Sequence, residues 1–332
     1  MEILEKPFID VDSQLKKLTD RGLIIKDPSR ARIKLLRTSY YDLINGYKDM
    51  FLQDKETIEE EDKFIEGTTF EDILELHTLD RKIRHLVLEV LLDVECIFYS
   101  SMAYSISATY GEKHAEYLEK EKYRMGRKQK YNNLFERDNL LYKINKKINS
   151  PEVQPLIYYK EKYDNIPPWI LVKDLSFGEL VMLYKLSKDS VKTEVIRNII
   201  GAEPTEKDKE FFLKCVELFN KFRNWAAHGG RMYNHRTNIQ VPYVEELHSI
   251  LQISKEKHRK GNGRSDLAAV VLGVMYFFKK EPEGLFEFFI NLNYNMEEYQ
   301  KKQPLKYERV IKELGLPGNY YKVSLETLMS MD

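Results

Sequence analysis

Apolar residues recur every three or four positions along most of the chain, which is the spacing of one face of an α-helix. The clearest run spans residues 70–102, with apolar residues at positions 70, 73, 76, 79, 83, 86/87, 90/91, 94, 97/98 and 102. No run of alternating apolar and polar residues is long enough to indicate a strand. The pattern therefore predicts an all-α protein.

The longest predicted helix begins in a capping box, formed either by Thr68 with Glu71 or by Thr69 with Asp72. It continues for about 38 residues, which at about 1.5 Å per residue gives a rod of nearly 60 Å. A helix of this length usually spans a bundle. We therefore expect it to organise the rest of the fold.

The N-terminal segment is expected to form a small helical unit. Asp12 or Ser13 is expected to cap a short helix, which Gly22 ends. A second helix begins near Pro28 and runs to Asn45, with these apolar residues on one face: Ile33, Leu36, Tyr40 and Ile44. An acidic connector follows. The predicted domains are thus an N-terminal helical extension, 1–60, and a helical core with C-terminal helices, 68–332.

Further helices are predicted in the second half of the chain. A capping box of Ser176 with Glu179 starts one, and Pro204 with Thr205 starts another. Asp266 is expected to cap a third. Additional helical patterns cover 243–257, 266–279, 283–300 and 305–314.

Composition narrows the choice of partners only slightly. Lys and Arg total 53, as do Asp and Glu, so affinity for nucleic acid or anionic lipid has to come from local patches. Cys96 and Cys215 both lie in apolar helical patterns and are expected to be buried thiols. No segment resembles a signal peptide or a membrane span, which favours a cytoplasmic location without a membrane partner.

The stretch "KFRNWAAHGGRMYN", residues 221–234, places polar side chains at the end of an apolar helix. Gly229 can adopt the left-handed conformation that ends a helix, which puts His228 on the last turn. Asn224 and His228 share a face, whereas Arg223 lies about 140° from His228 around the helix axis. Only a bend or a partner subunit could bring Arg223 and His228 to one atom.

These residue types suit phosphodiester cleavage without a metal. His228 can move the proton of a ribose 2′-hydroxyl or of the leaving 5′-oxygen, Arg223 can hold the phosphate, and Asn224 can orient either group. The simpler alternative is an ordinary helix end, in which the cations meet the helix dipole. A metal site built on His228 and His235 is less consistent, because their spacing matches no known signature.

Other residues could bind RNA. Directly after the motif, Arg231, Tyr233 and Asn234 could hold substrate phosphate or could fix the loop. The segment 120–147 contains ten Lys or Arg residues and three acidic ones, with interleaved tyrosines. It is either the solvated face of a surface helix or a strip that follows phosphates, for which the candidate residues are Arg127, Lys128 and Lys130.

The motif "RNWAAHGGRMYN" resembles that of the HEPN ribonucleases, R-x(4-6)-H with Asn commonly after the Arg. More closely, the chain is similar to the abortive-infection (Abi) proteins of bacterial phage defence, in the AbiD and AbiF group. Two further blocks carry this resemblance: "PPWI…LSFGEL…LYKL" within 167–186, and "LTDRGLIIKDPSRARIKLLRTSYYDLINGY" near the N-terminus. The matches run in order from about residue 13 to 234. One departure is Gly229, where the family commonly has a second His.

The resemblance implies an all-α HEPN-like helical bundle with a small N-terminal helical extension. It implies a homodimer in which two motif helices face each other, and RNA as substrate and as a bound noncoding partner. Because no nucleotide-binding or serine-hydrolase motif is found, no cofactor is expected. The prediction is a metal-independent endoribonuclease that acts as a toxin in abortive infection. The alternative is a noncatalytic protein that holds a structured RNA.

Overall fold

The computed structural model of the chain describes residues 8–57, 60–130 and 133–318. Within these ranges it contains α-helices, short 3₁₀ and π turns and four isolated β-bridges, and it has no strand. The all-α prediction is therefore confirmed. The α-helices are α1 (Val11–Asp20), α2 (Pro28–Thr38), α3 (Phe70–Tyr110), α4 (His114–Tyr117), α5 (Glu136–Asn149), α6 (Leu156–Tyr163), α7 (Pro168–Leu171), α8 (Phe177–Leu186), α9 (Asp189–Ile200), α10 (Glu206–Ala227), α11 (Glu245–Ile250), α12 (Lys255–Arg259), α13 (Leu267–Phe277), α14 (Glu283–Lys302) and α15 (Pro304–Leu314). The shorter turns are η1 (Tyr41–Asn45), η2 (Lys48–Met50), η3 (Lys120–Lys122) and η4 (Val172–Asp174).

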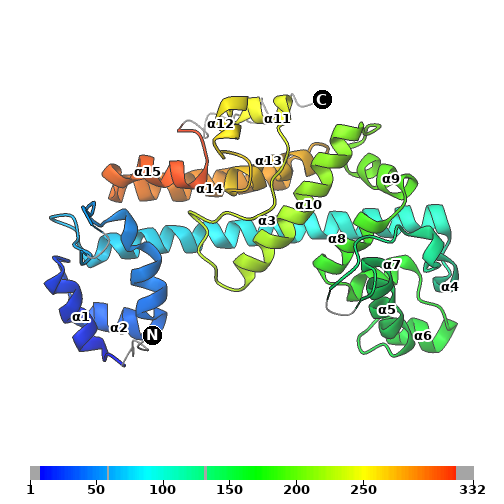
Figure 1. Cartoon of the computed structure of the whole chain (residues 1–332), viewed down its shortest axis with the longest axis horizontal. Helices are drawn as coiled ribbons and strands as arrows, with labels where there is room; N and C mark the ends of the chain where they lie inside the picture. The colour runs from blue at the N-terminus through cyan, green and yellow to red at the C-terminus, as the bar shows by residue number, and fades with distance from the viewer. Residues whose placement is uncertain (1–7, 58–59, 131–132, 319–332) are drawn as a thin grey trace.

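Helix α3 is the axis of the molecule, and the other elements are arranged along it (Figure 1). Its 41 residues give a rod of about 60 Å. Of the two capping boxes predicted, the one formed is Thr69 with Asp72. The helix contacts α9, α10 and α14. A single long helix thus packs against segments that lie far apart in the sequence.

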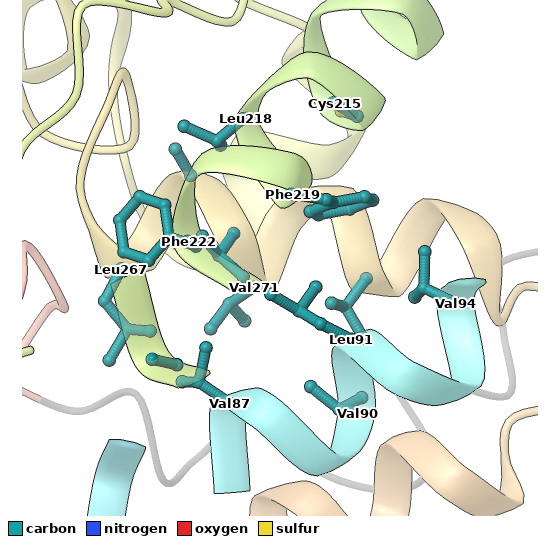
Figure 2. Close-up of a cluster of buried hydrophobic side chains, with 14 of the residues drawn as sticks. Val87, Val90, Leu91, Val94, Cys215, Leu218, Phe219, Phe222, Leu267 and Val271 are labelled. Carbon is teal, nitrogen blue, oxygen red and sulfur yellow. The ribbon is translucent and has the colours of Figure 1, made fainter. Parts of the chain in front are cut away.

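The main core lies where α10 crosses α3 and α13 packs against both. Figure 2 shows aliphatic side chains of α3 meeting the aromatic face of α10, with Leu267 and Val271 of α13 closing the cluster. All eleven residues of α13 are buried. Gly273 permits this packing, since a Cβ atom there would lie 2.6 Å from the ring of Phe219. Close packing of this kind fixes the path of α10, and with it the position of the motif at its end.

The N-terminal unit differs from its prediction in two ways. Asp10, and not Asp12 or Ser13, caps α1, and its Oδ1 accepts a hydrogen bond from the backbone N–H of Ser13. The second predicted helix breaks at Ser39, which has φ +62° and whose hydroxyl accepts a hydrogen bond from the backbone N–H of Asp42 in the following π turn. The predicted face is confirmed at Ile44, which is fully buried. It is wrong within α2, where Leu35 is buried while Ile33 and Leu36 are more than half exposed. Because the helix is interrupted at Ser39, residues before and after it do not lie on one common helical face.

The basic segment 120–147 is α-helical only from Glu136 onward, so the surface helix, one of the two predicted alternatives, is not formed over its first half. Gly126, at φ +70°, turns the chain, and Lys128 forms a β-bridge with Phe135. The Glu136 carboxylate then accepts a hydrogen bond from the backbone N–H of Arg127 at 3.0 Å. These local contacts favour a loop over a helix for this part of the chain.

Two further predictions need correction. The helix predicted over 243–257 is in fact two short helices, because the backbone reverses at Gln252 (φ +52°) and Ser254 caps α12. Cys215 is buried as expected, but Cys96 is exposed, since it lies on α3 beyond the buried stripe. The predicted division into domains at 60–68 stays a prediction.

Candidate active site at the end of α10

Both glycines of the motif have a structural role. Helix α10 starts in a capping box of Thr205 with Asp208 and ends with His228 as its C-cap. Gly229 has φ +77°, and its N–H bonds to the carbonyl of Ala226 while that of Gly230 bonds to the carbonyl of Trp225, which is a Schellman motif. A Cβ atom on Gly230 would lie 2.3 Å from the Trp225 ring. Gly229 therefore ends the helix, and Gly230 leaves space for the indole ring.

The chain after the glycines folds back over Trp225. The indole Nε1 donates a hydrogen bond of 2.7 Å to the carbonyl of Arg231. The ring of His235 stacks on the indole with centroids 4.5 Å apart and planes 8° apart, and it meets the ring of Phe222 edge-on. Because burial and the nearby Arg236 disfavour the imidazolium, the pKa of His235 falls to about 4. His235 is thus a neutral packing residue at neutral pH and supports the motif turn.

Acidification is expected to destabilise the protein in part through His235. The unfolded residue has an ordinary pKa of about 6.5, so between pH 6.5 and about 4 the unfolded state binds more protons. The stabilisation is complete above pH 6.5 and is lost as the pH falls toward 4. His235→Phe keeps an aromatic ring against Trp225 and removes the imidazole that takes up a proton. We therefore expect a smaller loss of Tm between pH 7 and pH 5 in this variant, measured by thermal unfolding.

His77, His248 and His258 also have lowered pKa values because of burial, so part of the acid sensitivity should remain in His235→Phe. A loss of Tm as large as that of the unchanged protein would contradict the role given to His235.

Arg223 points toward α3, away from His228. Its Nε lies 3.2 Å from Glu95 Oε2, an ion pair that lacks the alignment of a hydrogen bond. About a third of the Arg223 side chain is exposed, against 8% of the Glu95 side chain. Tyr99 donates a hydrogen bond of 2.8 Å to the other oxygen of Glu95. Because the carboxylate approaches from the Nε side, it orients the guanidinium and leaves its outer edge partly open to solvent.

His228 and Asn224 instead face an open groove of about 430 Å³. Both residues are exposed. The groove runs between the end of α10 and the loop that follows, and its lining residues are Lys221, Asn224, Trp225, His228, His235, Arg236, Thr237 and Asn238. Arg223 is not part of this lining. Arg223 and His228 are thus apart as predicted, on a helix that runs without interruption from Glu206 to Ala227.

Arg231 and Tyr233 fix the loop, which is the second of the two roles predicted for them. Arg231 donates a hydrogen bond to the carbonyl of Gly46 in the N-terminal unit, and its guanidinium lies 5.9 Å from the centre of the Tyr233 ring. Tyr233 is only 2% exposed and stacks on Tyr47. Tyr233 is therefore a core residue, and its burial removes it from the residues predicted to hold substrate phosphate. Asn234 is half-buried beside it.

A buried carboxylate on α3 holds this loop in place. Asp80 is fully buried, and its Oδ1 accepts hydrogen bonds from the backbone N–H groups of Met232 at 2.8 Å and of Tyr233 at 2.6 Å. Its Oδ2 accepts a hydrogen bond of 2.8 Å from the hydroxyl of Tyr47. One turn further along α3, Arg84 donates to the carbonyl of Gly229 at 3.1 Å. Asp80 therefore joins the motif loop, the N-terminal unit and α3.

Sequence reasoning missed the roles of Asp80 and Glu95, although a signal was present. Both acids fall within the apolar stripe of α3, beside Leu79 and Val94. A charged residue in such a stripe is rarely buried without a partner. Searching the stripe for acids could have identified both residues, but it could not have named their partners.

The basic loop lies apart from the groove in the sequence and in its contacts. Arg127, Lys128 and Lys130 are exposed, and none of them lines the groove beside His228. The segment before them pairs with the end of α8 through a bridge between Tyr123 and Ser187. Their predicted contact with RNA stays a prediction.

Among the described residues, no group of three or more His, Cys, Asp or Glu side chains is placed to hold a metal ion. A membrane-spanning helix is likewise not found in the part of the chain that the structure describes.

The model of the Abi-like protein family matches residues 34–234, which is more than half of the chain and includes all of α3 and α10. Comparisons with curated proteins and with solved structures give no match.

Proposed function

The chain belongs to the Abi-like protein family, and from this premise we propose that it is a metal-independent endoribonuclease of abortive-infection defence. The observation that carries the proposal is the arrangement of the motif. An exposed histidine and asparagine face a groove at the end of a rigid helix, while an oriented arginine lies on a different side of that helix. This arrangement suits a reaction centre that is completed by a second copy of the chain.

The proposed reaction is an internal transesterification of RNA. The ribose 2′-oxygen attacks the adjacent phosphorus atom, and the bond from phosphorus to the 5′-oxygen breaks. A base removes the proton of the 2′-hydroxyl, and an acid gives a proton to the leaving 5′-oxygen. The products are a 2′,3′-cyclic phosphate and a 5′-hydroxyl. His228 can perform either proton transfer, because an imidazole ring nitrogen can accept or donate a proton and this side chain is accessible.

Arg223 would stabilise the charge that develops on the phosphate, and Asn224 would orient the imidazole or the phosphate. Glu95 fixes the guanidinium from its Nε side, which leaves donors on the outer edge for the phosphate oxygens. In a symmetric dimer that pairs the two α10 ends, His228 of one chain and Arg223 of the other approach the same phosphate. The separation of the two side chains within one chain then becomes a requirement of the site.

Mixing two inactive variants tests this arrangement directly. Arg223→Ala and His228→Ala are each expected to be inactive alone. A heterodimer of the two retains one histidine facing one arginine across the interface. After co-expression, or after subunit exchange, we expect about one quarter of the unchanged protein's cleavage, because half of the dimers are mixed and each has one of two intact pairs. The measurement is the rate of RNA cleavage, followed by analysis of the product ends.

No recovery in the mixture, while mixed dimers are detected by differential tags, would show that histidine and arginine act within one chain. Cleavage should persist in excess EDTA. Cleavage that appears only on addition of a divalent metal ion would contradict the metal-independent mechanism.

The alternative is a noncatalytic protein that holds a structured RNA. The exposed side chains of Lys128 and Lys130, away from the groove, favour this function because they offer a second contact for phosphates. Strong, salt-sensitive binding without turnover, together with phage defence that survives His228→Ala, would support the alternative over the nuclease.

A further inference from the structure

The groove beside His228 has the charge of an anion-binding surface. Two permanent cations, Lys221 and Arg236, line it together with the two histidines, and no Asp or Glu is among its lining residues. Its volume of about 430 Å³ falls in the usual range for small-ligand sites. It also extends well beyond the atoms that the cleavage step requires, so there is room for a neighbouring part of the substrate.

Lys221 stands at the far end of this groove from His228. Residues 221, 224, 225 and 228 are spaced at i, i+3, i+4 and i+7, so they share one face of α10. Lys221 and His228 are separated by two helical turns, about 10.5 Å along the axis. Lys221 is exposed and forms no ion pair with any described residue. It can therefore contact a phosphate other than the one at His228.

Arg236 forms the opposite wall and is held in place by backbone groups. Its Nη1 donates to the carbonyl of His235 at 2.9 Å, and its Nη2 donates to the carbonyl of Glu313 at 2.8 Å. These bonds use two of the five N–H donors of a guanidinium. The remaining donors are available at the edge of the groove, on a side chain whose position is already fixed. A fixed cation binds phosphate with less loss of conformational entropy than a mobile one.

We propose that Lys221 and Arg236 bind the backbone of the RNA strand next to the scissile phosphate, so that the groove guides single-stranded substrate to His228. This inference rests on the proposed nuclease function for the identity of its ligand. Each copy of the chain would contribute one such groove, which leads away from the shared reaction centre. The contacts are to phosphates, so they would position the strand without choosing a base sequence.

The test is a binding measurement in the His228→Ala background, where the substrate stays intact. The probe is a fluorescently labelled single-stranded RNA of mixed sequence. We expect Lys221→Gln to weaken binding about fivefold, and to reduce the slope of log affinity against log salt by about 0.7, since one cation no longer displaces a counterion. The matched control is Lys207→Gln, an exposed lysine near the start of the same helix, which should change neither quantity.

Equal affinity and slope in Lys221→Gln and in the His228→Ala protein alone would overturn the proposal. Tight binding of a free nucleoside monophosphate, dependent on Lys221 and as strong as that of the RNA, would also overturn it, because the occupant would then be a single nucleotide. The cleavage assay distinguishes the two proposals. RNA binding that depends on Lys221 in a protein without cleavage supports the groove and rejects the nuclease, and the opposite combination rejects the groove alone.

Discussion

Replacing His228 by alanine is expected to lower the rate of RNA cleavage by about 10²- to 10⁴-fold, the range that a positioned acid or base contributes. The His228 side chain is exposed and the residue is the C-cap of α10, so removal of the imidazole should leave the fold intact. The measurement is the single-turnover cleavage rate of the purified protein. In bacteria that express it, growth arrest should disappear with the same substitution.

His85→Ala is a suitable control, because His85 is an exposed histidine on α3 outside the groove. It should leave cleavage unchanged, and both variants should keep the Tm of the unchanged protein. If His228→Ala cleaves RNA at the original rate, the assignment of His228 as the acid or base is wrong.

Asp80→Ala is expected to give the largest loss of stability, about 3 to 5 kcal/mol, because the substitution leaves three buried donors without an acceptor. The donors belong to the motif loop and to the N-terminal unit, so the loss should also loosen the contact between them. The free energy of unfolding from urea denaturation gives the magnitude. Hydrogen exchange at Met232 and Tyr233 should rise in the native state.

Asp80→Asn provides a graded comparison, since its amide oxygen can still accept from both backbone N–H groups. It should destabilise the protein much less than alanine does. Asp93→Ala, at an exposed acid on the same helix, should cost less than about 0.5 kcal/mol. A loss below about 1 kcal/mol for Asp80→Ala would show that the buried carboxylate does not hold the loop.

The parts of the fold that the sequence predicts well are those decided by neighbouring residues. The capping residues Thr69, Ser176, Thr205 and Asp266 each hydrogen-bond to a backbone N–H three positions on, so a short stretch of sequence contains the whole signal. The apolar period of α3 was equally clear. By contrast, the break at Ser39 depends on a positive φ at a residue other than glycine, and the sequence contains no signal for it.

In the candidate site too, the sequence predicts the features that depend on neighbouring residues and not those that depend on distant ones. Helical geometry alone separates Arg223 from His228, and the glycines indicate where α10 ends. The partners of these residues come from segments more than a hundred positions away, since Glu95 pairs with Arg223 and Asp80 holds the loop at Met232. A single sequence gives no information on such pairings. The groove was also not predicted, because its second wall is a loop that folds back on the helix.

The unbroken course of α3 limits how the length of the chain can change. Asp80 and Glu95 lie fifteen residues apart on this helix, about 22 Å along its axis, and each holds a different part of the motif. Insertion of one residue between them would rotate one acid by about 100° relative to the other, and the motif would lose one of its two supports. A change of seven or eleven residues would keep both acids on one face of α3, but it would move them more than about 10 Å relative to each other along the axis and would break one contact as well. Insertions and deletions should therefore accumulate in the loops and not between these two acids.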